Sequence, residues 1–152
     1  FKVGGIYRHI NNPIINKLIL KQRKKSITSN TSFYTPKGKK SAKDIIDAIK
    51  KKLSICLLID QKDSAGEDIL FFKQNAKTQI GFIKLARKYK LEIILVENCR
   101  KNLNNFTLKF SPLKEINTNI SDIQVMQEIH YIIEKWIKKN PSSWFLQHNR
   151  FN

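Results

Sequence analysis

Four stretches of this chain place apolar residues every three or four positions, which is the spacing of one buried face of an α-helix. The predicted helices span residues 13–25, 41–52, 76–89 and 122–139. Asn12 and Pro13 are suited to cap and open the first helix, and Ser121 is suited to cap the last. The last helix has the clearest apolar stripe, formed by Ile123, Met126, Ile129, Ile133, Trp136 and Ile137.

Short apolar runs between these helices predict β-strands. The expected strands lie at residues 1–7, 33–34, 55–59, 69–72, 91–96 and 106–110. The runs at 55–59 and 91–96 are continuous, which is typical of strands buried on both faces in α/β sheets. Residues 106–110 alternate apolar and polar positions, which is typical of a half-buried strand near a sheet edge.

Strands and helices therefore alternate along most of the chain. This order predicts an α/β fold with three layers, in which helices flank a mixed, mostly parallel sheet. The 152 residues suit one domain and are too few for two ordinary ones. Because the chain opens inside a predicted strand and has no initiator Met, we expect residues 1–152 to be the C-terminal part of a single, longer domain.

The chain is strongly basic. Its 29 Lys and Arg residues against 12 Asp and Glu residues give a net charge of +17. Such an excess favours an acidic partner: nucleic acid, an anionic membrane surface or an acidic protein. A biased base composition also produces this excess, because Lys, Ile and Asn are all abundant here. No apolar run reaches the roughly 18 residues that a membrane-spanning helix needs.

Metal and thiol chemistry have little support in the sequence. Cys56 and Cys99 lie in strand-like apolar runs without a CxxC spacing, so we expect buried, reduced thiols. No cluster of metal ligands is visible.

Two polar pairs leave the ends of predicted strands. Asp60 and Gln61 follow the run 55–59, the position where α/β proteins usually bind a ligand. The alternative is that Asp60 caps the next turn and Gln61 is solvated, which spacing alone slightly favours. Tyr7 and Arg8 also leave a strand, where an arginine can clamp a phosphate or carboxylate. On composition alone, Arg8 is better explained as one of many surface cations.

The histidines indicate no catalytic site. His148 lies near Arg150 after Trp144, and an isolated histidine usually has a structural role. His130 and Glu134 share a helical face, which we interpret as surface electrostatics of the helix. The chain has no GxSxG, no HExxH and no glycine-rich phosphate loop. The residues alone therefore indicate no self-contained catalytic machinery.

Several blocks, in order along the chain, match one family. They are Gly5-Ile6-Tyr7-Arg8 with Asn12-Pro13; Leu57-Leu58-Ile59-Asp60-Gln61; Phe71-Phe72 with Ala76 and Thr78; Leu85-Ala86; and Trp136-Ile137 with Pro141, Trp144, His148, Arg150 and Phe151. With these blocks the chain resembles the lipid A late acyltransferases, the lauroyl and myristoyl transferases related to the lysophospholipid and glycerolipid acyltransferases. The terminal block is the most specific. We expect it to serve packing, with Trp136 on the core face and Trp144 and Phe151 folding the tail back.

The chain departs from the family pattern in four respects. Lys73 replaces the glycine after Phe-Phe, and His9 stands where a proline is common after Tyr-Arg. The family's catalytic His-x-x-x-x-Asp/Glu motif precedes the Tyr-Arg block and is not in this chain, and neither is its N-terminal membrane helix. The resemblance therefore implies no catalytic residue among residues 1–152.

The resemblance implies acyl transfer from an acyl-thioester, usually acyl carrier protein, to a hydroxyl of a lipid A precursor, without a cofactor. It implies a location at the cytoplasmic face of the bacterial inner membrane. Arg8 would stabilise the charged intermediate or hold phosphate, and Asp60 and Gln61 would line the same pocket. Acyl carrier protein, the phosphorylated lipid and the anionic membrane surface would be the acidic partners of the basic chain.

Two other functions stay open. A glycerophospholipid acyltransferase with a different acceptor shares the same chemistry, and only the terminal block favours lipid A. A non-enzymatic, basic nucleic-acid-binding module rests on charge alone, because no RNA motif or recognition helix is apparent. We expect only nonspecific, salt-sensitive binding to nucleic acid.

Overall fold

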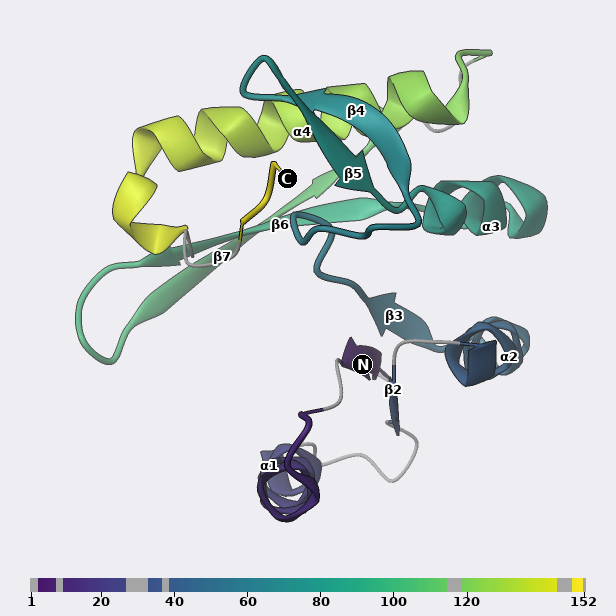
Figure 1. The fold of residues 1–152 in the computed structure, drawn as a ribbon, viewed down its shortest axis with the longest axis vertical. Coiled ribbons are helices and arrows are strands. Elements are labelled where there is room, and N and C mark those ends of the chain that lie inside the picture. The colour runs from purple at the N-terminus through teal and green to yellow at the C-terminus, as the bar shows by residue number, and fades with distance from the viewer. Residues whose placement is uncertain are drawn as a thin grey trace. The chain divides into compact units, whose positions relative to one another are not determined.

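The computed structural model describes residues 3–7, 10–26, 33–36, 39–114, 119–144 and 149–151, with the backbone alone for 7, 26, 33–36, 39 and 40. The chain divides into two compact units, residues 1–58 and 59–152. Figure 1 shows their helices and strands.

The first unit is built around a small parallel sheet. Its elements are β1 (Val3–Tyr7), α1 (Pro13–Ser26), β2 (Phe33–Pro36), α2 (Lys39–Lys50) and β3 (Ser54–Cys56). The strand order is β2-β1-β3, and β1 pairs in parallel with both neighbours. Parallel neighbours need a crossover connection, which α1 and α2 provide. The alternation of strands and helices predicted from the sequence is confirmed here.

The start of α1 follows the sequence prediction. Asn12 Oδ1 accepts hydrogen bonds from the backbone N–H groups of Ile14, at 3.0 Å, and Ile15, at 3.2 Å. Pro13 is the first helical residue, where its missing N–H leaves no hydrogen bond unmade. The predicted cap and the predicted helix opening are both confirmed.

The strand predicted at 55–59 is wrong in length and burial. β3 pairs with β1 over only three residues and ends at Cys56. Beyond it, Leu58 is 74% exposed. Cys56 is a free thiol but is exposed rather than buried, because it ends a strand that has a single neighbour in the described part of the sheet.

The second unit contains two antiparallel hairpins and two helices. Its elements are β4 (Glu67–Phe71), β5 (Gln74–Thr78), α3 (Gly81–Tyr89), β6 (Ile94–Arg100), β7 (Phe106–Pro112), α4 (Asp122–Lys139) and the short 3₁₀-helix η2 (Pro141–Ser143). β4 pairs with β5 and β6 pairs with β7. With the first unit, these elements make a mixed α/β fold whose described strands form three small sheets.

The helix predicted at 76–89 is wrong in its first part. Residues Gln74–Thr78 form β5, and α3 begins only at Gly81. The physical reason is the two-residue turn at Phe72 and Lys73, which have φ angles of 49° and 63°. Positive φ at both positions matches the twist of a tight hairpin, so the chain returns along β4 instead of starting a helix.

The strand predicted at 91–96 is also wrong in its burial. β6 begins at Ile94, and along it Leu95 faces the core while its neighbours Ile94 and Val96 are exposed. β7 was expected to be half-buried, yet its residues Phe106, Leu108 and Phe110 are exposed.

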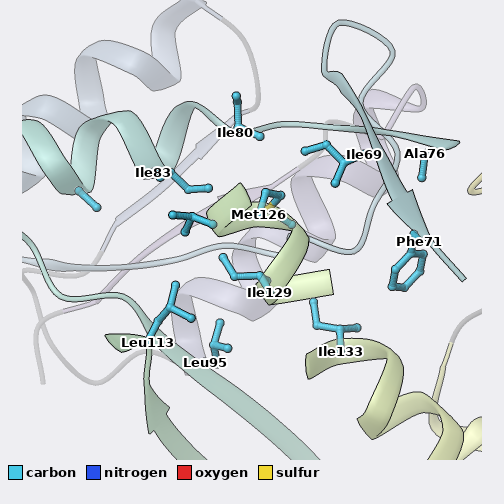
Figure 2. Close-up of a cluster of buried hydrophobic side chains, with 12 residues drawn as sticks. Ile69, Phe71, Ala76, Ile80, Ile83, Leu95, Leu113, Met126, Ile129 and Ile133 are labelled. Atoms are coloured by element: carbon cyan, nitrogen blue, oxygen red, sulfur yellow. The ribbon is translucent and has the colours of Figure 1, made fainter. Parts of the chain in front are cut away.

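A single apolar core holds the second unit together. It consists of Ile69, Phe71, Ala76, Ile80, Ile83, Ala86, Leu95, Leu113, Val125, Met126, Ile129 and Ile133 (Figure 2). α4 contributes the stripe predicted from the sequence, except that Ile123 is 47% exposed. Ser121 Oγ accepts from the Gln124 N–H at 3.2 Å, and Gln124 Oε1 accepts from the Ser121 N–H at 2.8 Å, which forms a capping box at the start of α4.

The described residues show neither a membrane-spanning helix nor a metal site. None of their helices is both long and apolar enough to cross a membrane. No group of three or more His, Cys, Asp or Glu side chains within this part of the chain is placed to hold a metal ion.

The stripe of α4 makes a test of the core. Ile129 is fully buried, so Ile129→Ala should lower the free energy of unfolding by about 2–5 kcal/mol through lost apolar contact and a residual cavity. Ile123→Ala, on the exposed edge of the same helix, should change it by no more than about 0.5 kcal/mol. Urea unfolding of both variants measures the difference, and equal losses would contradict this assignment of the buried face.

Candidate functional site

The site residues predicted from the sequence are described to different extents. Asp60 is partly buried and Gln61 is exposed, and both lie near the start of the second unit. Arg8 and His148 lie outside the described residues, and Tyr7 is described by its backbone alone. The pocket expected from Arg8, Asp60 and Gln61 therefore stays a prediction.

Asp60 is joined to the terminal block. Its Oδ2 accepts a hydrogen bond from Trp144 Nε1 at 3.2 Å, across 84 positions of sequence. The turn that follows uses a different carboxylate, because Asp63 Oδ1 accepts from the Ala65 N–H at 3.2 Å. The structure thus favours a tertiary role for Asp60 over the cap considered from spacing.

Aromatic rings from two predicted blocks pack together beside this hydrogen bond. The Trp144 ring lies 5.6 Å from Phe71, edge to face, and 5.8 Å from Phe72. Phe151 stacks on Phe71 at 6.1 Å. Trp136 also packs against the core. The prediction that the terminal aromatic residues fold the tail onto the core is confirmed.

Arg150 is buried in the same region and is 4% exposed. Its Nη1 donates to the Lys77 carbonyl at 2.8 Å, and its Nη2 donates to Thr78 Oγ1 at 2.6 Å. Its Nε has no partner among the described residues. Burial lowers the pKa of Arg150, whereas the negative charge of Asp60 raises it. The terminal arginine thus binds the threonine of the Phe-Phe block.

His130 completes the buried polar cluster. Its Nδ1 lies 2.9 Å from the Leu70 carbonyl oxygen, which can only accept, so Nδ1 carries the proton. Its Nε2 is then the acceptor that faces Thr78 Oγ1 at 3.4 Å and Arg150 Nη2 at 3.5 Å. Burial, and secondarily the charge of Arg150, lowers the pKa of His130, which keeps the ring neutral.

The interpretation of Glu134 as part of the helix's surface electrostatics is confirmed in part, because its Oε2 lies 3.9 Å from Lys138 Nζ one turn along α4, but both residues of the pair also have buried roles. His130 has no exposed surface, and Glu134 Oε1 accepts from the Phe72 N–H at 2.7 Å. One signal could have revealed this, because His130 lies between Ile129 and Ile133 within the apolar stripe of α4. Gln127 was also missed; its Nε2 donates to the Leu70 carbonyl at 3.0 Å.

The turn at Lys73 forms without the family's glycine. Phe72 and Lys73 both adopt the left-handed conformation, which costs an ordinary L-residue about 1–2 kcal/mol. The hydrogen bond from the Phe72 N–H to Glu134, together with the Phe72 contacts to Phe71 and Trp144, holds the strained turn in place.

Relief of this strain is measurable. Lys73→Gly should raise the free energy of unfolding by up to about 1 kcal/mol, because glycine adopts positive φ without a Cβ clash. Lys84→Gly, at an exposed position of α3, should lower it by about 1 kcal/mol. Chemical denaturation of both variants tests the opposite signs, and destabilisation by both would refute the left-handed turn.

The neutral His130 predicts acid sensitivity. An unfolded chain titrates this group near 6.5, and the folded chain titrates it lower, so between these values the unfolded state binds more protons. Stability should therefore be complete above pH 6.5 and should fall as the pH drops towards the folded pKa. Urea midpoints at pH 7.5 and 5.5 measure the fall.

A matched variant isolates this contribution. His130→Asn keeps a donor for the Leu70 carbonyl and cannot be protonated, so its urea midpoint should fall less between the two pH values. Arg150 and Glu134 are the charged groups that act on His130, and both remain in the variant. An equal fall in the two proteins would assign the acid sensitivity to other groups.

Comparison with known proteins places the chain in a family. No match was found among curated proteins. The family model of the bacterial lipid A biosynthesis acyltransferases matches residues 2–152. With this match over almost every residue, and with the paired blocks described above, the chain belongs to the bacterial lipid A biosynthesis acyltransferase family.

Proposed function

We propose that residues 1–152 are the C-terminal part of a single acyltransferase domain, with a three-layer, mostly parallel sheet in the complete protein. The complete enzyme transfers a fatty acyl chain from acyl carrier protein to a hydroxyl of a lipid A precursor. The observation that carries this proposal is the hydrogen bond from Trp144 to Asp60, since it joins two blocks that mark the family. A packed link between such blocks suits a site that both of them serve.

The proposed reaction needs a general base, which we place upstream of residues 1–152. In the proposed mechanism, the histidine of an upstream His-x-x-x-x-Asp/Glu motif removes the proton of the acceptor hydroxyl. The hydroxyl oxygen attacks the thioester carbonyl, and the C–S bond then breaks as the thiol leaves with a proton. Arg8 stabilises the negative oxygen of the intermediate or holds a phosphate of the acceptor. Asp60 and Gln61 line the pocket and orient polar groups of the acceptor.

The proposed partners are acidic, as the charge of +17 favours. They are acyl carrier protein, the phosphorylated acceptor and the anionic surface of the inner membrane, on its cytoplasmic face. α1 supports the last of these. Its Ile14 and Leu18 are 71% and 59% exposed, beside the exposed Lys17 and Lys21. A basic helix with an exposed apolar face suits a lipid–water interface.

The acceptor decides between this function and its closest alternative. The full-length enzyme, incubated with acyl carrier protein thioester and lipid A precursor, should yield a product heavier by one acyl chain in mass spectrometry. Acyl transfer to a lysophospholipid and not to the lipid A precursor would instead support the alternative function, a glycerophospholipid acyltransferase. An enzyme that transfers to neither acceptor, or an upstream sequence without the catalytic motif, would remove the enzymatic proposal.

Arg8 provides the sharpest single substitution. Arg8→Ala in the full-length enzyme should lower kcat on the order of a hundredfold with an unchanged melting temperature, because charge stabilisation of the intermediate is lost. Lys84→Ala removes an exposed cation of α3 and is the matched control, with kcat expected to stay within about twofold. Equal kcat values for Arg8→Ala and wild type would show that Arg8 is a surface cation without a role in the reaction.

A further inference from the structure

The loop that carries Asp60 and the chain end are fastened to the same strand. The Lys77 carbonyl of β5 accepts from the Asp63 N–H at 3.1 Å and from Arg150 Nη1 at 2.8 Å. Gly66 closes the loop against β5 so tightly that a Cβ there would lie 2.4 Å from the Thr78 carbonyl carbon. Loop and tail therefore share one support, the strand β5.

Trp144 bridges this loop and this tail. Its Nε1 donates to Asp60 Oδ2, and its ring packs on Phe71 and Phe72. Phe71 is fully buried, and the Phe72 N–H is held by Glu134, so the rings against the indole have little freedom to move. The direction of the indole N–H is thus set by packing before any substrate binds.

The two oxygens of the Asp60 carboxylate differ in their hydrogen bonds to the described residues. Trp144 occupies Oδ2, and no hydrogen-bond donor to Asp60 Oδ1 is observed in the described part of the chain. Asp60 as a whole residue is partly exposed. The buried cation of Arg150 interacts with the same carboxylate. A carboxylate that is held through one oxygen is suited to accept a hydrogen bond from a hydroxyl at the other oxygen in one orientation.

We infer that Trp144 is a positioning residue, which aims the Asp60 carboxylate at a hydroxyl of the acceptor, and that Arg150 fastens the tail on which Trp144 depends. This inference rests on the proposed function, because it assigns Asp60 to the acceptor side of that pocket. The terminal block, residues 136–151, then contributes to the reaction through the hydrogen bond from Trp144 to Asp60 as well as through packing. Trp144 itself does not touch the reacting atoms.

A double-mutant cycle in the full-length enzyme separates positioning from packing. Trp144→Phe removes the N–H and keeps an aromatic ring, and it should lower kcat/KM about tenfold, on the scale of one charge-assisted hydrogen bond. In the Asp60→Ala background, the same change should lower kcat/KM by less than about twofold. Trp136→Phe, in the same block but on the core face of α4, should leave kcat/KM within about twofold in both backgrounds.

The outcomes are distinct. If Trp144→Phe lowers kcat/KM about tenfold in both backgrounds, the positioning role is overturned and only a packing role remains. The same conclusion follows if the loss of kcat/KM is accompanied by a matching loss of melting temperature. A loss confined to the enzyme with Asp60 supports the inference. The cycle is read on whichever acceptor the wild-type enzyme uses. If the wild-type enzyme acylates a lysophospholipid but not the lipid A precursor, the proposed acceptor is overturned. The double-mutant cycle on the lysophospholipid still decides the role of Trp144.

Discussion

The burial of the Arg150 guanidinium is the constraint around which the second unit is arranged. A buried cation is strongly unfavourable unless hydrogen bonds and a nearby negative charge replace its lost water. Here the Lys77 carbonyl, Thr78 Oγ1 and the charge of Asp60 provide that compensation. These contacts require Thr78 to face inward on β5 and require the chain end to lie against that strand. His130 must then remain neutral, since a second buried cation would repel the first.

The hairpin between β4 and β5 shows how such tertiary contacts offset local strain. Phe72 and Lys73 both have positive φ, which ordinary residues adopt only at a cost in free energy. Glu134 compensates by accepting the Phe72 N–H, and Trp144 packs on the Phe72 ring. The family's glycine is thus replaced without loss of the turn, because α4 and the tail hold it from outside. The same contacts place Trp144 beside Asp60.

Features that depend on near neighbours were predictable from the sequence. The caps at Asn12 and Ser121 need only side chains within three residues, and the stripe of α4 needs only a regular period. The apolar spacing predicts a helix from Ala76 onward, but residues 76–78 belong to β5. These residues pair with β4. The turn between the two strands contains no glycine, so the sequence gives no sign of a tight turn there. The prediction that the strands at 55–59 and 91–96 are buried on both faces was also wrong, because an apolar run does not reveal how many neighbours a strand has.

The sequence by itself determined the family, through blocks whose order and spacing survive without any coordinates, and it identified Asp60, Thr78, Trp144 and Arg150 as members of those blocks. Only the tertiary structure decided that these residues meet in pairs, and that His130 and Glu134 belong beside them. The reason is physical. Periodicity and capping act over a few residues, whereas the contacts between Asp60 and Trp144 and between Thr78 and Arg150 span 84 and 72 positions and exist only once the core has packed.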